Sequence, residues 1–288
     1  MANPEAHRPA GVWVTPDEVR RLCDFIYRRT GMLFADNKRY YVDRRLAERI
    51  AATHSLSFQA YFALLRSNAD GEIQHLVNAF TVNETYFYRE EHQLRCMTSN
   101  LLNGATDRAR PIRIWSIPCS TGEEPYSIAI WLMENWSQVD QYSIEIIGSD
   151  IDTTALKAAE IGIYGDRALM RLSPQLIDRY FEPLTDDHYR IDPGLTNSIH
   201  FTRANLVDAQ QMAHYRDFDI IFCRNVLIYF DDSSRRMAAE SLYDCLRPGG
   251  YIFLGHSETM SRISPLFDVC RFSDAIVYRR PETDHGDN

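Results

Sequence analysis

The sequence contains no long apolar run. The longest uninterrupted one, residues 128–133, is well short of the roughly 20 residues that a membrane-spanning helix needs. The N-terminus also lacks the charged and then apolar layout of a secretion signal. We therefore expect a cytoplasmic protein without membrane insertion.

Cysteine is sparse and dispersed. The six cysteines form no C-x-x-C pair, and no histidine lies near them at the spacing of metal ligands. This pattern gives little support to a zinc site or a redox centre. We expect reduced, buried thiols and no bound metal.

Positive charge is also in short supply. The formal net charge of −9 argues against a general nucleic-acid binder. The distribution is uneven, because residues 1–90 carry 12 Lys and Arg against 11 Asp and Glu, whereas residues 91–288 carry 19 against 29. The first part of the chain is therefore the better candidate for contact with an acidic partner.

One predicted helix, residues 38–52, concentrates this positive charge. Lys38, Arg45 and Arg49 are spaced at i, i+7 and i+11, which places them on one stripe of a helix. Such charges often do no more than solvate a surface. The alternative, which we favour, is that the stripe docks an acidic partner.

The length of 288 residues suggests about two domains, since a domain averages roughly 150 residues. Up to residue 90 the patterns are helical, beginning with a capping box at Thr15 and Glu18 and with Pro16 in the first turn. We expect a disordered lead (1–12), a helical domain (13–90), a linker helix (91–105), a sheet domain (106–280) and a disordered tail (281–288).

Short β-rich runs alternate with helical patterns after residue 104. The runs at 112–117, 144–148 and 219–223 predict a parallel sheet with crossover helices, that is, an α/β fold. Two last runs, 268–272 and 275–278, predict an antiparallel edge. A hairpin is expected around residues 192–194, joining 189–191 to 199–201.

Ligands of an open α/β sheet bind beyond the carboxyl ends of its strands. The turn after the first predicted strand has one glycine and two carboxylates, Glu123 and Glu124, which would repel a pyrophosphate at a helix N-terminus. Carboxylates suit a ligand with an amino or sulfonium cation. They also favour the positive end of a helix, and from this turn alone the two interpretations weigh equally.

Two further turns carry polar side chains. Asp150 follows the second strand, where an acid can accept hydrogen bonds from ribose hydroxyls, although enzymes that use NAD have such an acid as well. Arg224, Asn225 and Tyr229 follow the strand at 219–223 and belong to the same edge. These turns indicate a nucleoside site and leave the cofactor open.

Five ordered motifs resemble the CheR family of chemotaxis receptor methyltransferases. They are Asn-Glu-Thr-x-Phe-x-Arg at 83–89, Ser-Thr-Gly-Glu-Glu-Pro-Tyr-Ser at 120–127, Ser-Asp-Ile-Asp at 149–152, Cys-Arg-Asn-Val-x-Ile-Tyr-Phe at 223–230 and Leu-Arg-Pro-Gly-Gly-Tyr at 246–251. The resemblance implies methylation of receptor glutamates with S-adenosylmethionine, which leaves S-adenosylhomocysteine. It also implies a seven-stranded, mostly parallel, Rossmann-like sheet, a helical N-terminal domain and an inserted β-subdomain near 164–202.

The resemblance assigns roles position by position. The residues that it implies as cofactor contacts are Asn83, Thr85, Arg89, Glu123, Glu124, Asp150, Asn205, Leu206, Arg224 and Asn225. Arg89 and Tyr229 are the candidates that orient the substrate, and the motif does not decide whether Glu123 or Glu124 makes the main contact. The residues expected to dock the cytoplasmic part of a receptor are Lys38, Arg39, Arg45 and Arg49. A receptor-tail tether at the β-subdomain is a further possibility.

Three other functions compete with this interpretation. An oxidoreductase that binds a dinucleotide is disfavoured by the missing glycines and the paired carboxylates. Another alternative is a binding module that keeps the cofactor pocket but transfers no methyl group. Only an activity assay distinguishes such a module from the enzyme. A methyltransferase of the same family that serves another signalling array has the same motifs.

Overall fold

The computed structural model describes residues 14–67, 71–104 and 109–282. The expected disordered lead lies outside the described residues, and so does the expected tail apart from residues 281 and 282. The chain separates into two compact units, Met1–Thr81 and Val82–Asn288. We describe each unit by itself.

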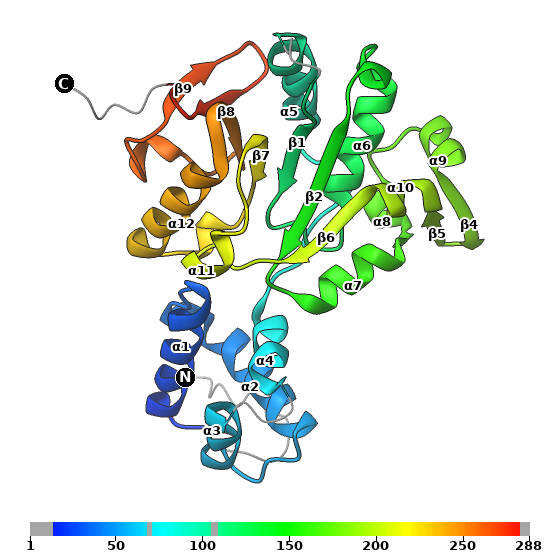
Figure 1. The fold of residues 1–288 in the computed structure, drawn as a ribbon. Helices are drawn as coiled ribbons and strands as arrows, with labels where there is room; N and C mark the ends of the chain where they lie inside the picture. Colours follow the sequence, from blue (N-terminus) through cyan, green and yellow to red (C-terminus); the bar gives the residue numbers. More distant parts are fainter. Residues whose placement is uncertain (1–13, 68–70, 105–108, 283–288) are drawn as a thin grey trace, which may run out of the picture. The chain divides into compact units, whose positions relative to one another are not determined.

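The first unit is helical, as expected. It contains α1 (Pro16–Thr30), the 3-10 turn η1 (Asp36–Lys38), α2 (Arg39–Ala52), α3 (Phe58–Ser67) and α4 (Glu72–Phe80), drawn in blue to cyan in Figure 1. The predicted capping box of Thr15 and Glu18 is present, and Gly31 ends α1 in the left-handed conformation. The buried face of α1 includes Leu22 and Ile26.

The boundary between the units lies between Thr81 and Val82, earlier than the boundary at residue 90 that the sequence predicts. Residues 82–90 belong to the second unit because they are bonded to it: the Phe87 N–H donates to the Ala168 carbonyl at 2.9 Å, and the Tyr88 N–H donates to Ser127 Oγ at 3.0 Å. The Phe87 ring is fully buried against Tyr164. This segment is therefore fixed to the sheet domain.

The expected linker helix is part of the core of the second unit. It consists of α5 (Glu91–Cys96), the π-helical turn η3 (Met97–Leu101) and the 3-10 turn η4 (Leu102–Gly104). Leu94, Met97 and Leu102 are buried in the same apolar cluster as the strands. The apolar side of this helix packs against the sheet instead of spanning between domains.

A seven-stranded sheet forms the centre of the second unit, which confirms the expected fold. Its order is β6-β2-β1-β7-β8-β10-β9, and it is parallel except for the two pairs that involve β10. The strands are β1 (Ile112–Ser116), β2 (Ile144–Asp150), β6 (Ile199–Arg203), β7 (Phe218–Cys223), β8 (Leu246–Leu254), β9 (Asp268–Arg271) and β10 (Ile276–Arg279). The last two form the predicted antiparallel edge.

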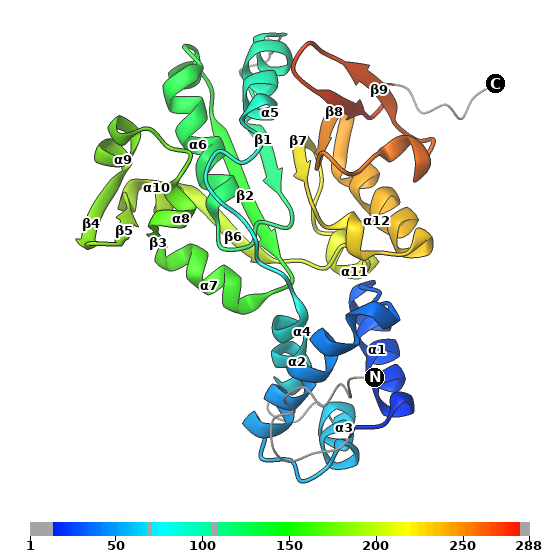
Figure 2. The same ribbon diagram turned by 180° about the vertical axis from the view of Figure 1, so that it is seen from behind.

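Helices connect the parallel strands and cover the sheet (Figures 1 and 2). The longer ones are α6 (Glu123–Asn135), α7 (Thr153–Ile161) and α12 (Asp232–Cys245), and the shorter ones are α11 (Ala209–Met212), η5 (Val139–Gln141), η6 (Leu227–Tyr229) and η7 (Met260–Arg262). In the register of the sheet, Ser116 lies opposite Gly148 on one side and Phe222 on the other. The carboxyl ends of β1, β2 and β7 are therefore aligned.

The predicted hairpin around residues 192–194 is wrong. Asp192 accepts a bond from the Gly194 N–H and Pro193 occupies the first turn, so these residues begin the helix α10 (Pro193–Ser198). The two flanking strands then enter different sheets. β6 joins the main sheet, while β5 (His188–Ile191) lies between β3 (Ile163–Gly165) and β4 (Phe181–Thr185) in a small sheet.

This small antiparallel sheet is the inserted β-subdomain, and its strands end at Ile191, before residue 202. Two short helices, α8 (Asp166–Leu169) and α9 (Pro174–Tyr180), pack on β3 and β4 respectively (Figure 2). Ser173 caps α9 by accepting a bond from the Leu176 N–H at 3.3 Å.

Candidate functional site

The turn between β1 and α6 brings a main-chain loop close to α7. Ser120 and Gly122 both have positive φ, 49° and 95°. A Cβ at Gly122 would lie 2.8 Å from the Cβ of Ala159, so only glycine fits there. The Tyr164 hydroxyl donates to the Thr121 carbonyl at 2.8 Å and fixes the turn from the β-subdomain.

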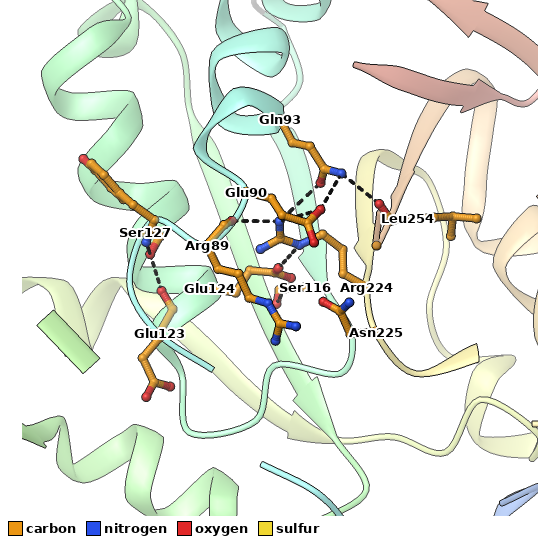
Figure 3. A network of polar contacts seen from close by, with 12 residues as sticks. Arg89, Glu90, Gln93, Ser116, Glu123, Glu124, Ser127, Arg224, Asn225 and Leu254 are labelled. Carbon is orange, nitrogen blue, oxygen red and sulfur yellow. Dashed lines mark hydrogen bonds and ion pairs between the residues drawn. The ribbon is translucent and has the colours of Figure 1, made fainter. Parts of the chain in front are cut away.

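Glu123 and Glu124 follow this turn and point in different directions (Figure 3). The Glu124 carboxylate accepts a bond from Ser116 Oγ at 2.8 Å and forms a buried ion pair with the Arg224 guanidinium. It is therefore engaged within the protein. Its role here is to hold β7 against the beginning of α6.

Glu123 is buried, with 4% of its surface exposed, and its environment is different. Its carboxylate accepts a bond from the Thr121 hydroxyl at 2.7 Å. Burial raises the pKa of Glu123, and the bond from Thr121 opposes this shift in part. A buried carboxylate of this kind gains most from a cation that binds beside it.

Arg224 lies at the centre of a polar network (Figure 3). Besides Glu124, its guanidinium donates to the Arg89 carbonyl at 2.8 Å and to Gln93 Oε1 at 3.3 Å, and it lies 3.6 Å from Glu90. With 7% of its surface exposed, Arg224 is occupied by protein groups. The structure thus gives this side chain a positioning role, where the resemblance implied a cofactor contact.

Sequence reasoning missed Glu90 and Gln93 in this network. Gln93 Nε2 donates to the Leu254 carbonyl at 2.8 Å, so α5 is bonded to the end of β8 as well as to Arg224. Glu90 has positive φ, 56°, and lies just beyond the motif at 83–89. Their place in the network can be recognised only from the tertiary structure, which brings together three segments that are distant in the sequence.

Asp150 ends β2 and is 3% exposed. Its two oxygens accept bonds from the main-chain N–H groups of Ser120 and Asp152, both at 2.8 Å. Burial raises the pKa of Asp150 to about 6, although these two bonds act in the opposite direction. The carboxylate lies where the β1 and β2 turns meet, as the sequence predicted.

The motif at 83–89 contributes side chains to the same turns. Asn83 Nδ2 donates to Asp152 at 2.8 Å, and the Ser120 hydroxyl donates to Asn83 Oδ1 at 3.0 Å. Asp152 also caps α7 by accepting bonds from the Thr154 and Ala155 N–H groups. Thr85 is half-buried, and so is Arg89, whose guanidinium donates to the Glu84 carbonyl at 2.6 Å.

Asn205 and Leu206 follow β6, the strand next to β2. Both are buried, and the Val207 N–H donates to Asn205 Oδ1 at 3.3 Å. The parallel pairing of β6 with β2 puts the beginning of this segment beside Asp150, because Asp150 lies opposite Arg203. The structure therefore groups Asn205 with the other turns at the carboxyl edge.

The loop after β7 carries Asn225, which has φ of 60°, and Tyr229 in η6. The carboxylate of Glu258 holds this loop by accepting bonds from four main-chain N–H groups. The donors are Asn225 at 2.8 Å, Leu227 at 2.7 Å, Ile228 at 3.3 Å and Gly255 at 2.8 Å. Sequence analysis gave Glu258 no role, and its place shortly after β8 is the one signal that could have drawn attention to it.

The basic residues of the first unit have different environments. Lys38 is exposed, Arg39 pairs with Asp43 at 2.7 Å, and Arg45 pairs with Glu48 at 3.1 Å. These pairs are partly open to solvent. Lys38 at the end of η1, and Arg39 and Arg45 on α2, are thus accessible.

Arg49 is bonded within the first unit. It donates to both oxygens of Glu72 at 3.0 and 2.6 Å, and Glu72 is 3% exposed. The Tyr61 hydroxyl donates to the same carboxylate at 2.8 Å. Arg49 therefore joins α2 to α3 and α4, in contrast to the docking role that its helical spacing suggested.

Within residues 14–67, 71–104 and 109–282, no three His, Cys, Asp or Glu side chains are grouped as a metal site requires. The six cysteines are buried or half-buried, and no disulfide joins them in the described part of the chain. Over the same part of the chain, no helix has both the length and the apolar character needed to cross a membrane.

Comparison with known proteins gives matches along most of the chain. Residues 83–276 match the SAM-binding domain of CheR methyltransferases, and residues 17–81 match the CheR all-alpha domain. Chemotaxis protein methyltransferase 2 of Vibrio cholerae is 46% identical over 278 residues, which is 95% of this chain and 96% of the relative. The chemotaxis protein methyltransferase of Salmonella typhimurium is 39% identical over 254 residues, 87% of this chain and 86% of the relative. The Escherichia coli protein of the same name is 38% identical over 254 residues, 87% of each chain.

Proposed function

The chain belongs to the CheR methyltransferase family, and we propose that it methylates glutamate side chains of chemoreceptors, using S-adenosylmethionine, for adaptation in chemotaxis. The observation that carries the proposal is the division between the two adjacent carboxylates. Glu124 neutralises Arg224, whereas Glu123 is buried and bonded to the Thr121 hydroxyl. Glu123 is thus the carboxylate suited to an amino cation.

The donor set fits an adenosyl amino acid. Glu123 would hold the amino group, Asp150 the ribose hydroxyls, and the buried Asn205 and Leu206 the adenine. Asn83, Thr85 and the main chain at Asn225 would complete the binding site. When bound, S-adenosylmethionine supplies a methyl group activated by its sulfonium.

The accepting glutamate is ionised at neutral pH and is itself the nucleophile, so the reaction requires no general base. The tasks left to the protein are to align this carboxylate and to exclude water from it. Arg89 and Tyr229 are our candidates for alignment. Arg89 is half-buried, and its guanidinium donates to the Glu84 carbonyl and has no ion-pair partner among the described residues, so its charge is available to a carboxylate.

Receptor docking falls to the accessible cations Lys38, at the end of η1, and Arg39 and Arg45, on α2. An acidic receptor helix would be attracted by this face. The proposal places the enzyme in the cytoplasm at receptor arrays, with a receptor-tail tether at the β-subdomain as an additional contact. It requires no metal, nucleic acid or membrane insertion.

The first test is calorimetric titration with S-adenosylhomocysteine, comparing the wild type with Asp150→Ala. We expect binding by the wild type that the substitution abolishes. Radiolabelled methyl transfer onto receptor-bearing membranes then separates the enzyme from a binding module. A folded wild-type protein that binds no S-adenosylhomocysteine would refute the cofactor assignment, and binding without transfer would refute the enzyme.

A further inference from the structure

A cleft of about 390 Å³ adjoins the loop that carries Tyr229. Its lining comes from η6, from α12 and from the segment after β8, and includes Leu227, Ile228, Arg235, Arg236, Arg262 and Ile263. Because η6 spans Leu227–Tyr229, the cleft and the candidate methyl-transfer side chain share one short loop. The Arg235 guanidinium fixes this edge by donating to the Leu227 carbonyl at 2.9 Å.

The cleft is positively charged in a part of the chain that is otherwise acidic. Its lining contains three arginines, Arg235, Arg236 and Arg262, against two acids. Glu258 accepts four main-chain bonds, and the exposed Asp232 pairs with Arg235 at 3.2 Å. Arg236 and Arg262 are exposed, and neither has an ion-pair partner among the described residues. Two cations are thus available to a ligand, whereas residues 91–288 as a whole carry 29 acidic against 19 basic residues.

We propose that this cleft binds the acidic receptor segment that flanks the methyl-accepting glutamate, with Arg236 and Arg262 contacting neighbouring carboxylates. The inference rests on the proposed function. In a helical substrate, residues one turn from the acceptor lie about 5.4 Å along the axis on the same face. When the acceptor glutamate is beside Tyr229, an adjacent turn lies over neighbouring surface, and the cleft adjoins Tyr229 because Leu227 and Ile228 of the same turn line it.

Apolar side chains of the cleft suit the same partner. Ile228 is 47% exposed and Ile263 is half-buried, so both can contact the methylene groups of long side chains on a helix. Charge and apolar contact together fit an amphipathic acidic helix. This surface belongs to the second unit, whereas the basic residues of α2 belong to the first.

The test measures initial rates of methyl transfer to receptor-bearing membranes with Arg236→Glu/Arg262→Glu in the full chain. We expect the KM for receptor to rise about tenfold at low salt, with kcat at saturating receptor and the Kd for S-adenosylhomocysteine unchanged. Because exposed charges are screened, the difference should shrink as salt is added. The milder pair Arg236→Gln/Arg262→Gln should raise the KM for receptor about threefold. It provides the test if Arg236→Glu/Arg262→Glu does not fold.

Lys157→Glu/Arg271→Glu is the matched control, since both residues are exposed in the sheet domain, lie outside the cleft and together undergo the same net charge change as the cleft pair. It should leave KM as in the wild type. A folded double variant with wild-type KM, or one that loses kcat alone, would overturn the cleft assignment while the proposed function stands. A wild type that transfers no methyl group would instead refute the proposed function.

Discussion

Arg224 and Glu124, which are 100 positions apart in the sequence, form a buried ion pair at the carboxyl edge of the sheet. The pair joins the end of β7 to the beginning of α6, and the Arg89 carbonyl completes it from the motif at 83–89. Three of the five sequence motifs thus meet at one guanidinium. This explains why a residue that resembles a cofactor contact serves to position the site.

The two adjacent glutamates should respond differently to substitution. Glu124→Gln leaves Arg224 buried without its main partner, and we expect the free energy of unfolding to fall by about 3 kcal/mol. Glu123→Gln should leave the free energy of unfolding at pH 7 unchanged or raise it slightly. The reason is that the raised pKa of Glu123 makes its ionised form unfavourable in the folded protein. It should instead weaken S-adenosylhomocysteine binding at least tenfold. Urea unfolding measures the stability and calorimetry measures the affinity. The division would be contradicted if the two variants lost the same affinity and neither lost stability.

Cofactor binding should depend on pH through Asp150. The carboxylate must be ionised to accept bonds from ribose hydroxyls, and its pKa of about 6 means that it becomes protonated below that pH. Affinity should therefore be constant from about pH 7 to 8 and decrease by up to about tenfold per pH unit below 6.

Glu123 contributes a dependence of the same sign, since its pKa is also raised by burial. The control is therefore Glu123→Gln. Any decrease in affinity at low pH that remains in this variant is due to Asp150. Asp150→Asn should bind weakly at every pH. An unchanged Kd for S-adenosylhomocysteine between pH 8 and 5 in the wild type would exclude an ionised Asp150 from the binding site.

Glu258 should control turnover through the loop that it holds. In Glu258→Gln one oxygen becomes an NH₂ group that faces main-chain donors, so the bonds to Leu227 and Ile228 or to Asn225 and Gly255 are lost. We expect kcat to fall at least tenfold while the KM for receptor changes less than threefold. Glu240→Gln, an exposed acid on α12, is the control. A variant with wild-type kcat would show that the loop is held without Glu258.

Arg45 and Arg49 should separate docking from stability. Arg45→Glu is expected to raise the KM for receptor several-fold with the Kd for S-adenosylhomocysteine unchanged, because Arg45 is accessible on α2. Arg49→Glu places a second acid against the buried Glu72 and should lower the free energy of unfolding by more than about 3 kcal/mol. Arg66→Glu, at an exposed position of α3, controls for charge alone. Loss of cofactor affinity in Arg45→Glu equal to the loss of receptor affinity would contradict the assignment.

The sequence by itself determined the elements whose causes are local. The capping box at Thr15 and Glu18 and the alternation of strands with helices depend on neighbouring residues, and the structure confirms both. The five motifs likewise identified the family, because motif order and spacing are properties of the chain. The turns that carry Asp150 and Glu123 could be located in the same way, since both follow apolar strands.

The tertiary structure decided what depends on partners far away in the sequence. Helical spacing put Arg49 in line with Lys38 and Arg45, but the buried Glu72 on α4 determines where its guanidinium lies. The residues around 192–194 resemble a hairpin turn, but the two flanking strands pair in different sheets, β6 with β2 and β5 with β3 and β4. The roles of Arg224 and Glu258 follow the same rule, because a buried charge is defined by the groups that satisfy it, and these come from other segments of the fold.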